Sequence, residues 1–387
     1  MTRRQFGPPR PARDAEHSVV YHNDSEFCCW PFLCGLWKTA EDHLVVGFMR
    51  NNCSYASPAD VNHDNPERIK TKLTILRSED RGRSWNSSRP TVLFDLGEVS
   101  EETIGNMPES YSGMPPIDFK DRNVLVASGA LPDYFRPKSR AWVRVSTDGG
   151  RSWRQPILPP LVGLPSLSGH ASALVRPDGV SLLFMTATSA DGWTRRPVVY
   201  ASVEDGSYWT FLSFMMPRSD DDDWAGDRAG GSLKYSAHRR YLPRPILLAD
   251  GRILASLRCQ RDPTSVFWTE IFESEDGGFT WRFVSRVNDW GAPGDLVQMK
   301  DGRIACVYGY RLPPYGVRAR ISEDDGRSWG SEIIIRDDGG SWDLGYPRVT
   351  EIEDGRLLVV YYMNRKDDSI FMGGGVRHIA QTIFTPA

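Results

Sequence analysis

One short turn motif recurs along this 387-residue chain and limits the folds open to it. The pattern Ser-x-Asp-x-Gly-x-x-Trp occurs four times, starting at Ser78, Ser146, Ser274 and Ser322, and a fifth copy at Ser202 has Glu in place of Asp. In each copy the carboxylate can accept backbone N–H groups across a hairpin turn, the glycine can take a positive φ, and the tryptophan can return to the core. Four complete copies predict an architecture of repeated units.

A second unit precedes these turns and consists of an apolar run, a tight turn and another apolar run. The clearest examples span residues 244–258, 295–311 and 346–364, each with Asp-Gly at the turn. Asp-Gly between apolar runs is a strong β-hairpin signal. Weaker examples begin at Trp30, Met114 and His170. Six hairpins, five of them followed by the turn motif, predict six four-stranded blades.

The sequence therefore predicts an all-β, six-bladed β-propeller whose blades carry Asp-box turns, the term used below for the Ser-x-Asp-x-Gly-x-x-Trp motif. The sixth unit has no Asp box, and residues 18–21 form a spare apolar strand ahead of the first blade. We expect this N-terminal strand to close the ring. Residues 1–16, rich in Arg and Pro, are predicted to be a mobile tail, and residues 17–387 a single propeller domain.

Charge and composition argue against several kinds of partner. The formal net charge is −3, so no basic surface favours nucleic acid or an anionic membrane. The chain shows neither a signal peptide nor a transmembrane segment, which predicts a cytoplasmic protein. Its six cysteines are too sparse for a disulfide scaffold and are predicted to be reduced. A metal site at Cys28, Cys29 and Cys34 is an alternative, but they form no CxxC pair, and we predict neither metal nor cofactor.

Ligand-binding residues are expected on the face opposite the Asp-box turns, where inner strands begin and second strands end around the central axis. These positions hold His170, Arg244 and Tyr346 at strand starts, and Arg50, Arg258 and Arg311 at strand ends. Converging arginines can bind a carboxylate through planar, bidentate contacts. The alternatives are that each arginine pairs with a neighbouring acid and that His170 is a structural histidine. The Asp-box carboxylates are interpreted as turn residues.

Two long loops interrupt the repeats. Residues 51–67 contain Asp60, His63, Asp64 and Glu67, and a loop of this length in a compact repeat is usually functional or mobile. Residues 218–240 contain a run of four aspartates that lacks the alternating ligands of a Ca²⁺ site, so we assign it no chemistry.

Taken together, these repeats resemble the sialidase superfamily, the Asp-box or BNR-repeat propellers, over nearly the whole chain. Sialidases cleave terminal sialic acids with retention through a Tyr nucleophile at the start of the last blade's inner strand. The segment Tyr346-Pro347-Arg348-Val349 is similar to that segment, so the resemblance implies Tyr346 as nucleophile. It also implies an acid/base Asp in the long loop of the first blade, at Asp64 or alternatively Asp60.

The chain departs from this family at the residues expected to hold the sialic carboxylate. Cys29-Trp30-Pro31 stands where the family has Arg-Ile-Pro. The stretch 246–248 is apolar where the family has the Glu that activates the Tyr, and the other two family arginines would fall near Trp268 and Pro314. Glu270 or a loop carboxylate is then the candidate for the base that a neutral Tyr needs.

The resulting prediction is a sialidase-like, exo-acting glycoside hydrolase for a terminal acidic or highly hydroxylated sugar. Two alternatives stay open, since propellers host unrelated chemistries. One is a carbohydrate-binding propeller without turnover. The other is a polysaccharide lyase on a uronate-containing glycan, in which His170 or a Tyr would abstract a proton and an Arg would neutralise the carboxylate.

Overall fold

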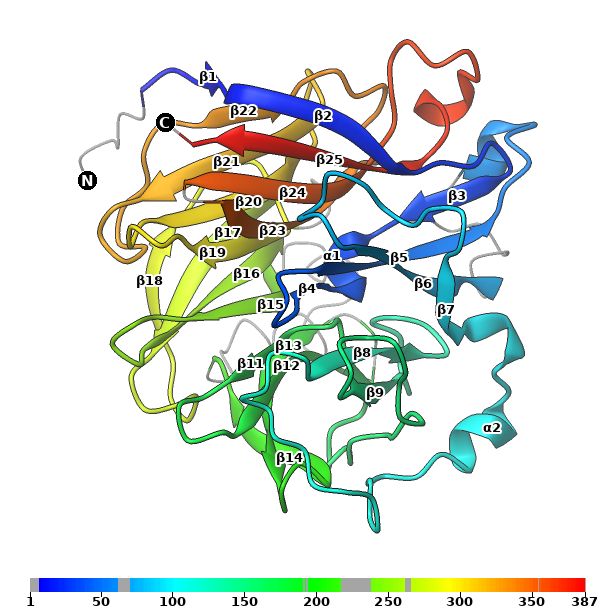
Figure 1. The fold of residues 1–387 in the computed structure, drawn as a ribbon, viewed down its shortest axis with the longest axis vertical. Coiled ribbons are helices and arrows are strands. Elements are labelled where there is room, and N and C mark those ends of the chain that lie inside the picture. Colours follow the sequence, from blue (N-terminus) through cyan, green and yellow to red (C-terminus); the bar gives the residue numbers. More distant parts are fainter. Residues whose placement is uncertain are drawn as a thin grey trace, which may run out of the picture.

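The computed structural model of this chain describes residues 7–61, 70–190, 192, 194–216, 238–261, 266–353 and 355–386. Its strands form separate sheets arranged around a central axis (Figure 1), so the chain is an all-β propeller. Within the described ranges, no helix has the length and apolar character needed to cross a bilayer. The helical elements are short: α1 (Pro31–Cys34), α2 (Glu101–Gly105), η1 (Pro58–Val61), η3 (Leu96–Glu98) and η6 (Met372–Gly374).

Five sheets have four or five strands each. The first blade comprises β3 (Glu26–Cys29), β4 (Leu36–Lys38), β5 (Leu44–Asn52), β6 (Lys72–Ser78) and β7 (Thr91–Asp95). The third comprises β10 (Leu167–Ser168), β11 (Ala173–Val175), β12 (Ser181–Thr188), β13 (Arg195–Val203) and β14 (Tyr208–Phe214). The fourth comprises β15 (His238–Leu247), β16 (Ile253–Arg261), β17 (Val266–Ser274) and β18 (Arg282–Arg286).

The fifth and sixth blades contain both the C-terminal strands and the N-terminal ones. The fifth comprises β19 (Gly294–Gln298), β20 (Ile304–Tyr310), β21 (Gly316–Ser322) and β22 (Ile333–Arg336), with β1 (Arg10–Pro11) parallel to β22. The sixth comprises β23 (Gly345–Glu353), β24 (Arg356–Met363) and β25 (His378–Thr385), with β2 (Arg13–Tyr21) antiparallel to β25. The N-terminal strand thus completes the last sheet. Strand pairing begins at Arg10, earlier than the expected end of the tail at residue 16.

The second repeat does not form a four-stranded blade, so the prediction of six such blades is wrong and the propeller has five complete blades. Its described residues give only β8 (Leu125–Leu131) and β9 (Arg140–Ser146), with one further bridge between Val143 and Ile157. Prolines explain the difference, because a residue without an N–H cannot donate to a strand ladder. Pro115 and Pro116 occupy the expected inner strand, and Pro156, Pro159 and Pro160 the outer one.

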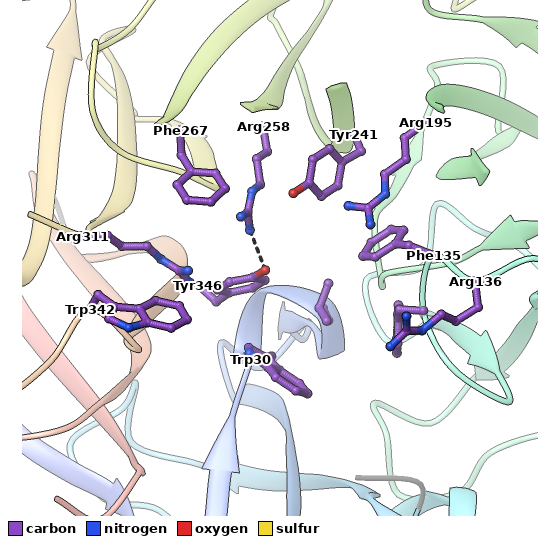
Figure 2. A pocket seen from close by; sticks show the side chains of 12 residues that line it. Trp30, Phe135, Arg136, Arg195, Tyr241, Arg258, Phe267, Arg311, Trp342 and Tyr346 are labelled. Carbon is purple, nitrogen blue, oxygen red and sulfur yellow. Dashed lines mark hydrogen bonds between the residues drawn. The ribbon is translucent and has the colours of Figure 1, made fainter. Parts of the chain in front are cut away.

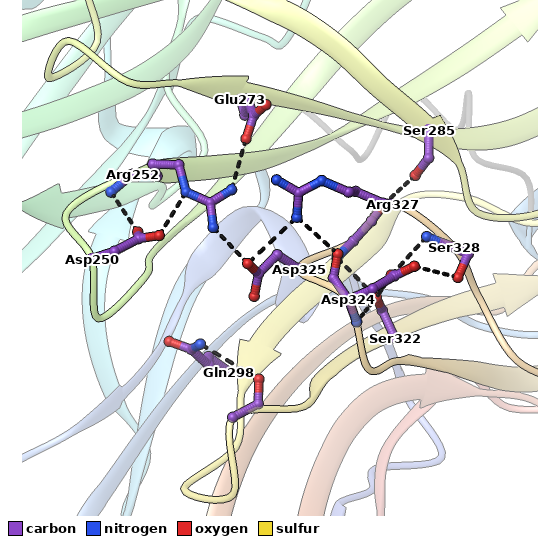
Figure 3. Close-up of polar contacts among 12 residues, drawn as sticks. Asp250, Arg252, Glu273, Ser285, Gln298, Ser322, Asp324, Asp325, Arg327 and Ser328 are labelled. Carbon is purple, nitrogen blue, oxygen red and sulfur yellow. Dashed lines mark hydrogen bonds and ion pairs between the residues drawn. The ribbon is translucent and has the colours of Figure 1, made fainter.

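The Asp-box turns are held together by their own side chains (Figure 3). In the fifth blade, Ser322 Oγ donates to Asp324 Oδ1 (2.8 Å) and accepts the N–H of Gly326 (2.8 Å). Asp324 Oδ1 also accepts the N–H of Ser328 (2.8 Å), and Asp324 Oδ2 accepts the Ser328 hydroxyl (2.5 Å). The carboxylate therefore closes the turn, which is the structural role expected of it.

The same turns connect neighbouring blades. Trp329 Nε1 donates to Ser285 Oγ of the fourth blade (3.0 Å), and Ser285 in turn donates to the carbonyl of Gly326. Arg252, at the β15–β16 turn, pairs with Asp325 of the next Asp box (2.5 Å) and with Glu273 (3.0 Å) (Figure 3). The β15–β16 turn and the neighbouring Asp box therefore share one face of the propeller, which leaves the opposite face for a ligand.

Candidate functional site

A cavity of about 360 Å³ opens where the strands of several blades meet (Figure 2). Ligand pockets of this size are common in proteins. Its walls are aromatic and cationic, and they are supplied by α1 and its preceding residue, the loop after β8, and strands or adjoining loops of the third to sixth blades. The lining residues are Trp30, Leu33, Tyr134, Phe135, Arg136, Arg195, Tyr241, Arg258, Phe267, Arg311, Trp342 and Tyr346.

Tyr346 lies in this pocket because the start of β23 is irregular. The pairing of β23 with β24 shifts register between Gly345 and Arg348, and Tyr346 has a φ of 47°. A non-glycine residue in this region costs of order 1 kcal/mol or more and persists only where its surroundings fix it. A Cβ on Gly345 would lie 2.7 Å from the Cα of Gly309, so this close approach requires glycine. The bulge is thus built into β23.

Arg258 fixes the Tyr346 hydroxyl. Its Nη1 donates to Tyr346 Oη at 2.6 Å (Figure 2), and its side chain is almost completely buried. Its guanidinium packs over the rings of Phe267 (4.3 Å) and Tyr241 (5.1 Å). The Tyr346 ring makes edge contacts with Phe32 (6.2 Å between centroids). A phenol oxygen and a cation are therefore held side by side at the pocket wall.

Arg311 approaches the same phenol from the fifth blade. Its guanidinium lies 5.3 Å from the Tyr346 ring and 5.4 Å from the Trp342 ring, and its Nη2 donates to the carbonyl of Leu344 (3.4 Å). The Nε atoms of Arg258 and Arg311 are buried without a hydrogen-bond partner among the described residues. No Asp or Glu of the described residues lines the cavity. The positive charge of the pocket is thus available to an anionic ligand.

Three of the expected ligand-binding residues lie elsewhere. Arg50 pairs with Glu26 (2.6 Å), because the register of β3 and β5 brings this acid beside it. Arg244 is buried and pairs with Asp295 (2.9 Å). His170 is fully buried, and burial together with the charge of Arg244 lowers the pKa of His170 to about 3. Arg50 and His170 therefore follow the structural alternatives, and His170 is neutral near pH 7.

The carboxylates predicted as acid or base are not among the described residues that line the cavity. Asp64 lies outside the described residues. Asp60 accepts hydrogen bonds from the hydroxyl of Ser54 (2.7 Å) and the N–H of Ser57 (2.9 Å), so it closes its own loop. Glu270, the candidate base, pairs with Arg240 (2.9 Å) and accepts Trp268 Nε1 (2.8 Å). Neither Glu270 nor these two partners line the cavity, and no described residue that lines it is a carboxylate base for Tyr346.

A buried ion cluster ties together the inner strands that carry the pocket. Asp295 of β19 bonds Arg244 of β15 through Oδ1 (2.9 Å) and Arg348 of β23 through Oδ2 (3.1 Å). Oδ2 also accepts the N–H of Val349 (2.8 Å). One carboxylate thus joins three inner strands, including the strand that presents Tyr346. Breaking a buried cluster of this kind is strongly destabilising.

Several residues that line the pocket were not predicted from the sequence. Arg195 begins β13 and so stands neither at the start of an inner strand nor at the end of a second one. Tyr241 lies within β15, and Trp342 stands four residues before Tyr346 in the loop that precedes β23. The side chain of Trp342 is half exposed. An exposed tryptophan near a predicted nucleophile was the one signal that could have been used.

No protein-family model matches the sequence, and no curated protein matches it. Solved structures do match it in fold. A protein of unknown function from Dyadobacter fermentans is 22% identical, with a TM-score of 0.70, over 96% of this chain and 98% of that one. Trypanosoma rangeli sialidase is 14% identical, with a TM-score of 0.60, over 96% of this chain but 60% of that one.

An α-L-arabinanase from Penicillium chrysogenum, solved with arabinobiose, is 12% identical, with a TM-score of 0.59, over 95% of this chain and 97% of that one. At these identities the likeness shows the fold alone, a propeller of the kind found in sialidases and this arabinanase.

Proposed function

We propose that this protein is an exo-acting glycoside hydrolase that removes a terminal acidic sugar, with Tyr346 as its nucleophile. The observation that carries the proposal is the 2.6 Å hydrogen bond from Arg258 to Tyr346. It lies in a pocket to which the described residues contribute four arginines and no carboxylate. The fold shared with sialidases supports the proposal by analogy.

The pocket has the two kinds of contact that an acidic sugar needs. Arg258 and Arg311 both lie against Phe267 and Tyr346, so one carboxylate can contact both guanidiniums beside the phenol. Trp342 provides an aromatic face for the apolar side of the sugar ring. A sugar held in this way would present its anomeric carbon to Tyr346 Oη.

In the proposed reaction, Tyr346 Oη bonds to the anomeric carbon while the bond from that carbon to the leaving oxygen breaks. A carboxylic acid protonates the leaving oxygen. The phenol proton passes to a loop carboxylate, the candidate base that remains because Glu270 is paired with Arg240. Water then cleaves the tyrosyl intermediate with retention. Arg258 stabilises negative charge on the phenol oxygen in both steps. Asp64 is proposed as the acid/base.

A polysaccharide lyase is the second candidate, and the lack of a lining carboxylate among the described residues favours it. In a lyase the phenolate of Tyr346 would remove the proton beside the uronate carboxylate. The bond from the neighbouring carbon to the glycosidic oxygen would break and leave a carbon–carbon double bond, and the leaving oxygen would take the proton from Tyr346 Oη. Arg258 and Arg311 would neutralise the carboxylate, and no water would be consumed.

Product analysis separates these reactions. The purified protein is incubated with 4-methylumbelliferyl glycosides of N-acetylneuraminate, glucuronate and glucose, and with oligouronates, and the products are measured by fluorescence and mass spectrometry. We expect release of a saturated acidic sugar and no reaction with the glucoside. An unsaturated product that absorbs in the ultraviolet would identify a lyase. Binding of acidic sugars without any product would identify a carbohydrate-binding propeller and reject both enzymes.

A further inference from the structure

A third pocket arginine, Arg195, stands apart from the pair that contacts Tyr346. Its guanidinium lies between two rings, 4.7 Å from Phe135 and 4.6 Å from Tyr241. Among the described residues, its Nε is buried without a hydrogen-bond partner and no carboxylate pairs with its guanidinium. The two rings offset part of the cost of burying this cation, but they supply no counter-charge.

Tyr241 separates Arg195 from Arg258. Both guanidiniums pack against the Tyr241 ring, at 4.6 Å and 5.1 Å, so they lie within about 10 Å of each other. Figure 2 shows the Tyr241 ring between them. The Tyr241 hydroxyl donates to Gln260 Oε1 at 2.6 Å. One small carboxylate seated between Arg258 and Arg311 therefore leaves Arg195 without a partner.

The two cation positions have the same character on opposite sides of one pocket. Each has a partly or fully buried guanidinium, aromatic packing and an Nε to which no described residue is hydrogen-bonded. Burial, reinforced by the nearby charges of Arg239 and Arg258, lowers the pKa of Arg195. An anion bound at Arg195 would relieve that cost, and charge-assisted hydrogen bonds are the strongest that proteins form. The spacing is within the reach of two groups on one sugar.

We propose that the pocket takes a sugar carrying two acidic groups, the first bound by Arg258 and Arg311 and the second by Arg195. This inference rests on the proposed function for the position of the first carboxylate. The substrate class is then a sugar acid with a second carboxylate, phosphate or sulfate on the same ring or its side chain.

Binding calorimetry on two matched pairs of ligands tests this inference without requiring turnover. The pairs are N-acetylneuraminate with its 9-phosphate, and glucuronate with its 1-phosphate. We expect the second acidic group to tighten binding about tenfold or more in at least one pair, as for one charge-assisted contact. Arg195→Gln should reduce that ratio to about twofold or less while changing the affinity for the monoacid little.

Three further variants serve as controls. Arg258→Gln should weaken both members of a pair, and Arg195→Lys should keep more of the preference than Arg195→Gln because it keeps the charge. The matched control is Arg196→Gln, since the Arg196 side chain packs over Phe214, 3.6 Å from its ring, and lines another hollow. It should leave the ratio unchanged.

The outcomes separate this inference from the proposed function. A wild-type ratio near one in both pairs, no binding of any ligand, or a ratio that survives Arg195→Gln in a folded protein would overturn the second anion site. If Arg195→Gln does not fold, Arg195→Lys is compared with Arg196→Gln. A full affinity ratio in Arg196→Gln and a reduced ratio in Arg195→Lys would still support the site. Equal ratios in these two variants would overturn it. Selective binding without turnover would reject both proposed enzymes and leave the second anion site supported.

Discussion

Removal of the Tyr346 hydroxyl tests the proposed nucleophile directly. Tyr346→Phe keeps the ring and its edge contacts with Phe32 and Tyr362, at centroid distances of 6.2 and 6.1 Å, so it creates no large cavity. What it removes is the oxygen that accepts Arg258 Nη1 at 2.6 Å. Because the Nε of Arg258 already lacks a partner in the described part of the chain, the substitution leaves this buried guanidinium with even fewer hydrogen bonds.

The expected stability cost follows from that single lost contact. Leaving one buried hydrogen-bonding group unsatisfied costs about 1–3 kcal/mol, which urea unfolding at pH 7 would measure. The expected kinetic effect is much larger: kcat should fall by at least about 10³-fold, because covalent catalysis needs the missing atom. The Kd for the sugar acid should change little, since the arginines remain.

Tyr362→Phe is the matched control. Its hydroxyl donates to Asp343 Oδ1 at 2.7 Å, its ring packs against Tyr346, and it does not line the cavity. It should cost a similar free energy of unfolding while keeping kcat within a few-fold of wild type. Normal turnover by Tyr346→Phe would refute the nucleophile, and equal losses of kcat in both variants would show that the effect is structural.

Three further predictions follow from the contacts described above. Arg258→Lys and Arg311→Lys should each raise the Kd for an acidic sugar by about tenfold, because an ammonium loses the planar fork; unchanged calorimetric affinities in both would contradict the anion site. Asp276→Asn should lower the free energy of unfolding by about 1–3 kcal/mol, because Asp276 Oδ2 accepts the Thr280 hydroxyl (2.6 Å) and the amide nitrogen that replaces it cannot accept a hydrogen bond, while the turnover of folded protein stays the same. Burial and the charge of Arg244 lower the pKa of His170 to about 3 in the folded protein. His170 therefore binds a proton below about pH 6.5 in the unfolded chain but only below about pH 3 in the folded chain. Stability should therefore fall by about 2 kcal/mol between pH 7 and pH 5, and urea unfolding at both values should show a smaller fall in His170→Gln.

The repeats made the fold predictable because each turn motif marks the same place in a blade. The second repeat shows where that reasoning fails. Its Asp box is intact at Ser146, yet Pro115 and Pro156 on either side remove backbone donors that its inner and outer strands need. Counting turn motifs therefore counts repeats, whereas only the residues between the turns decide whether a repeat becomes a four-stranded blade.

The site was partly predictable for the same reason. Tyr346, Arg258 and Arg311 stand at strand positions whose distance from the axis the repeat determines, and the structure brings them together. Arg50 stands at an equivalent strand end, but Glu26 across the sheet holds it away. Arg195 gave no signal, because its place in the pocket depends on rings from two other segments. Pairings between distant segments are not visible in a repeat pattern.

The pairing of β2 with β25 also has a consequence for synthesis of the chain on the ribosome. His17 and Thr382, which share a 2.8 Å hydrogen bond, are separated by 365 residues. At about 5–20 residues per second, β2 leaves the ribosome roughly 20–70 s before its partner strand exists. For that interval its edge is open to any other chain, and edge strands are protected by charge. Arg13, Asp14 and Glu16 at the start of β2 are charged, so we expect these side chains to protect the nascent chain against aggregation before β25 is made.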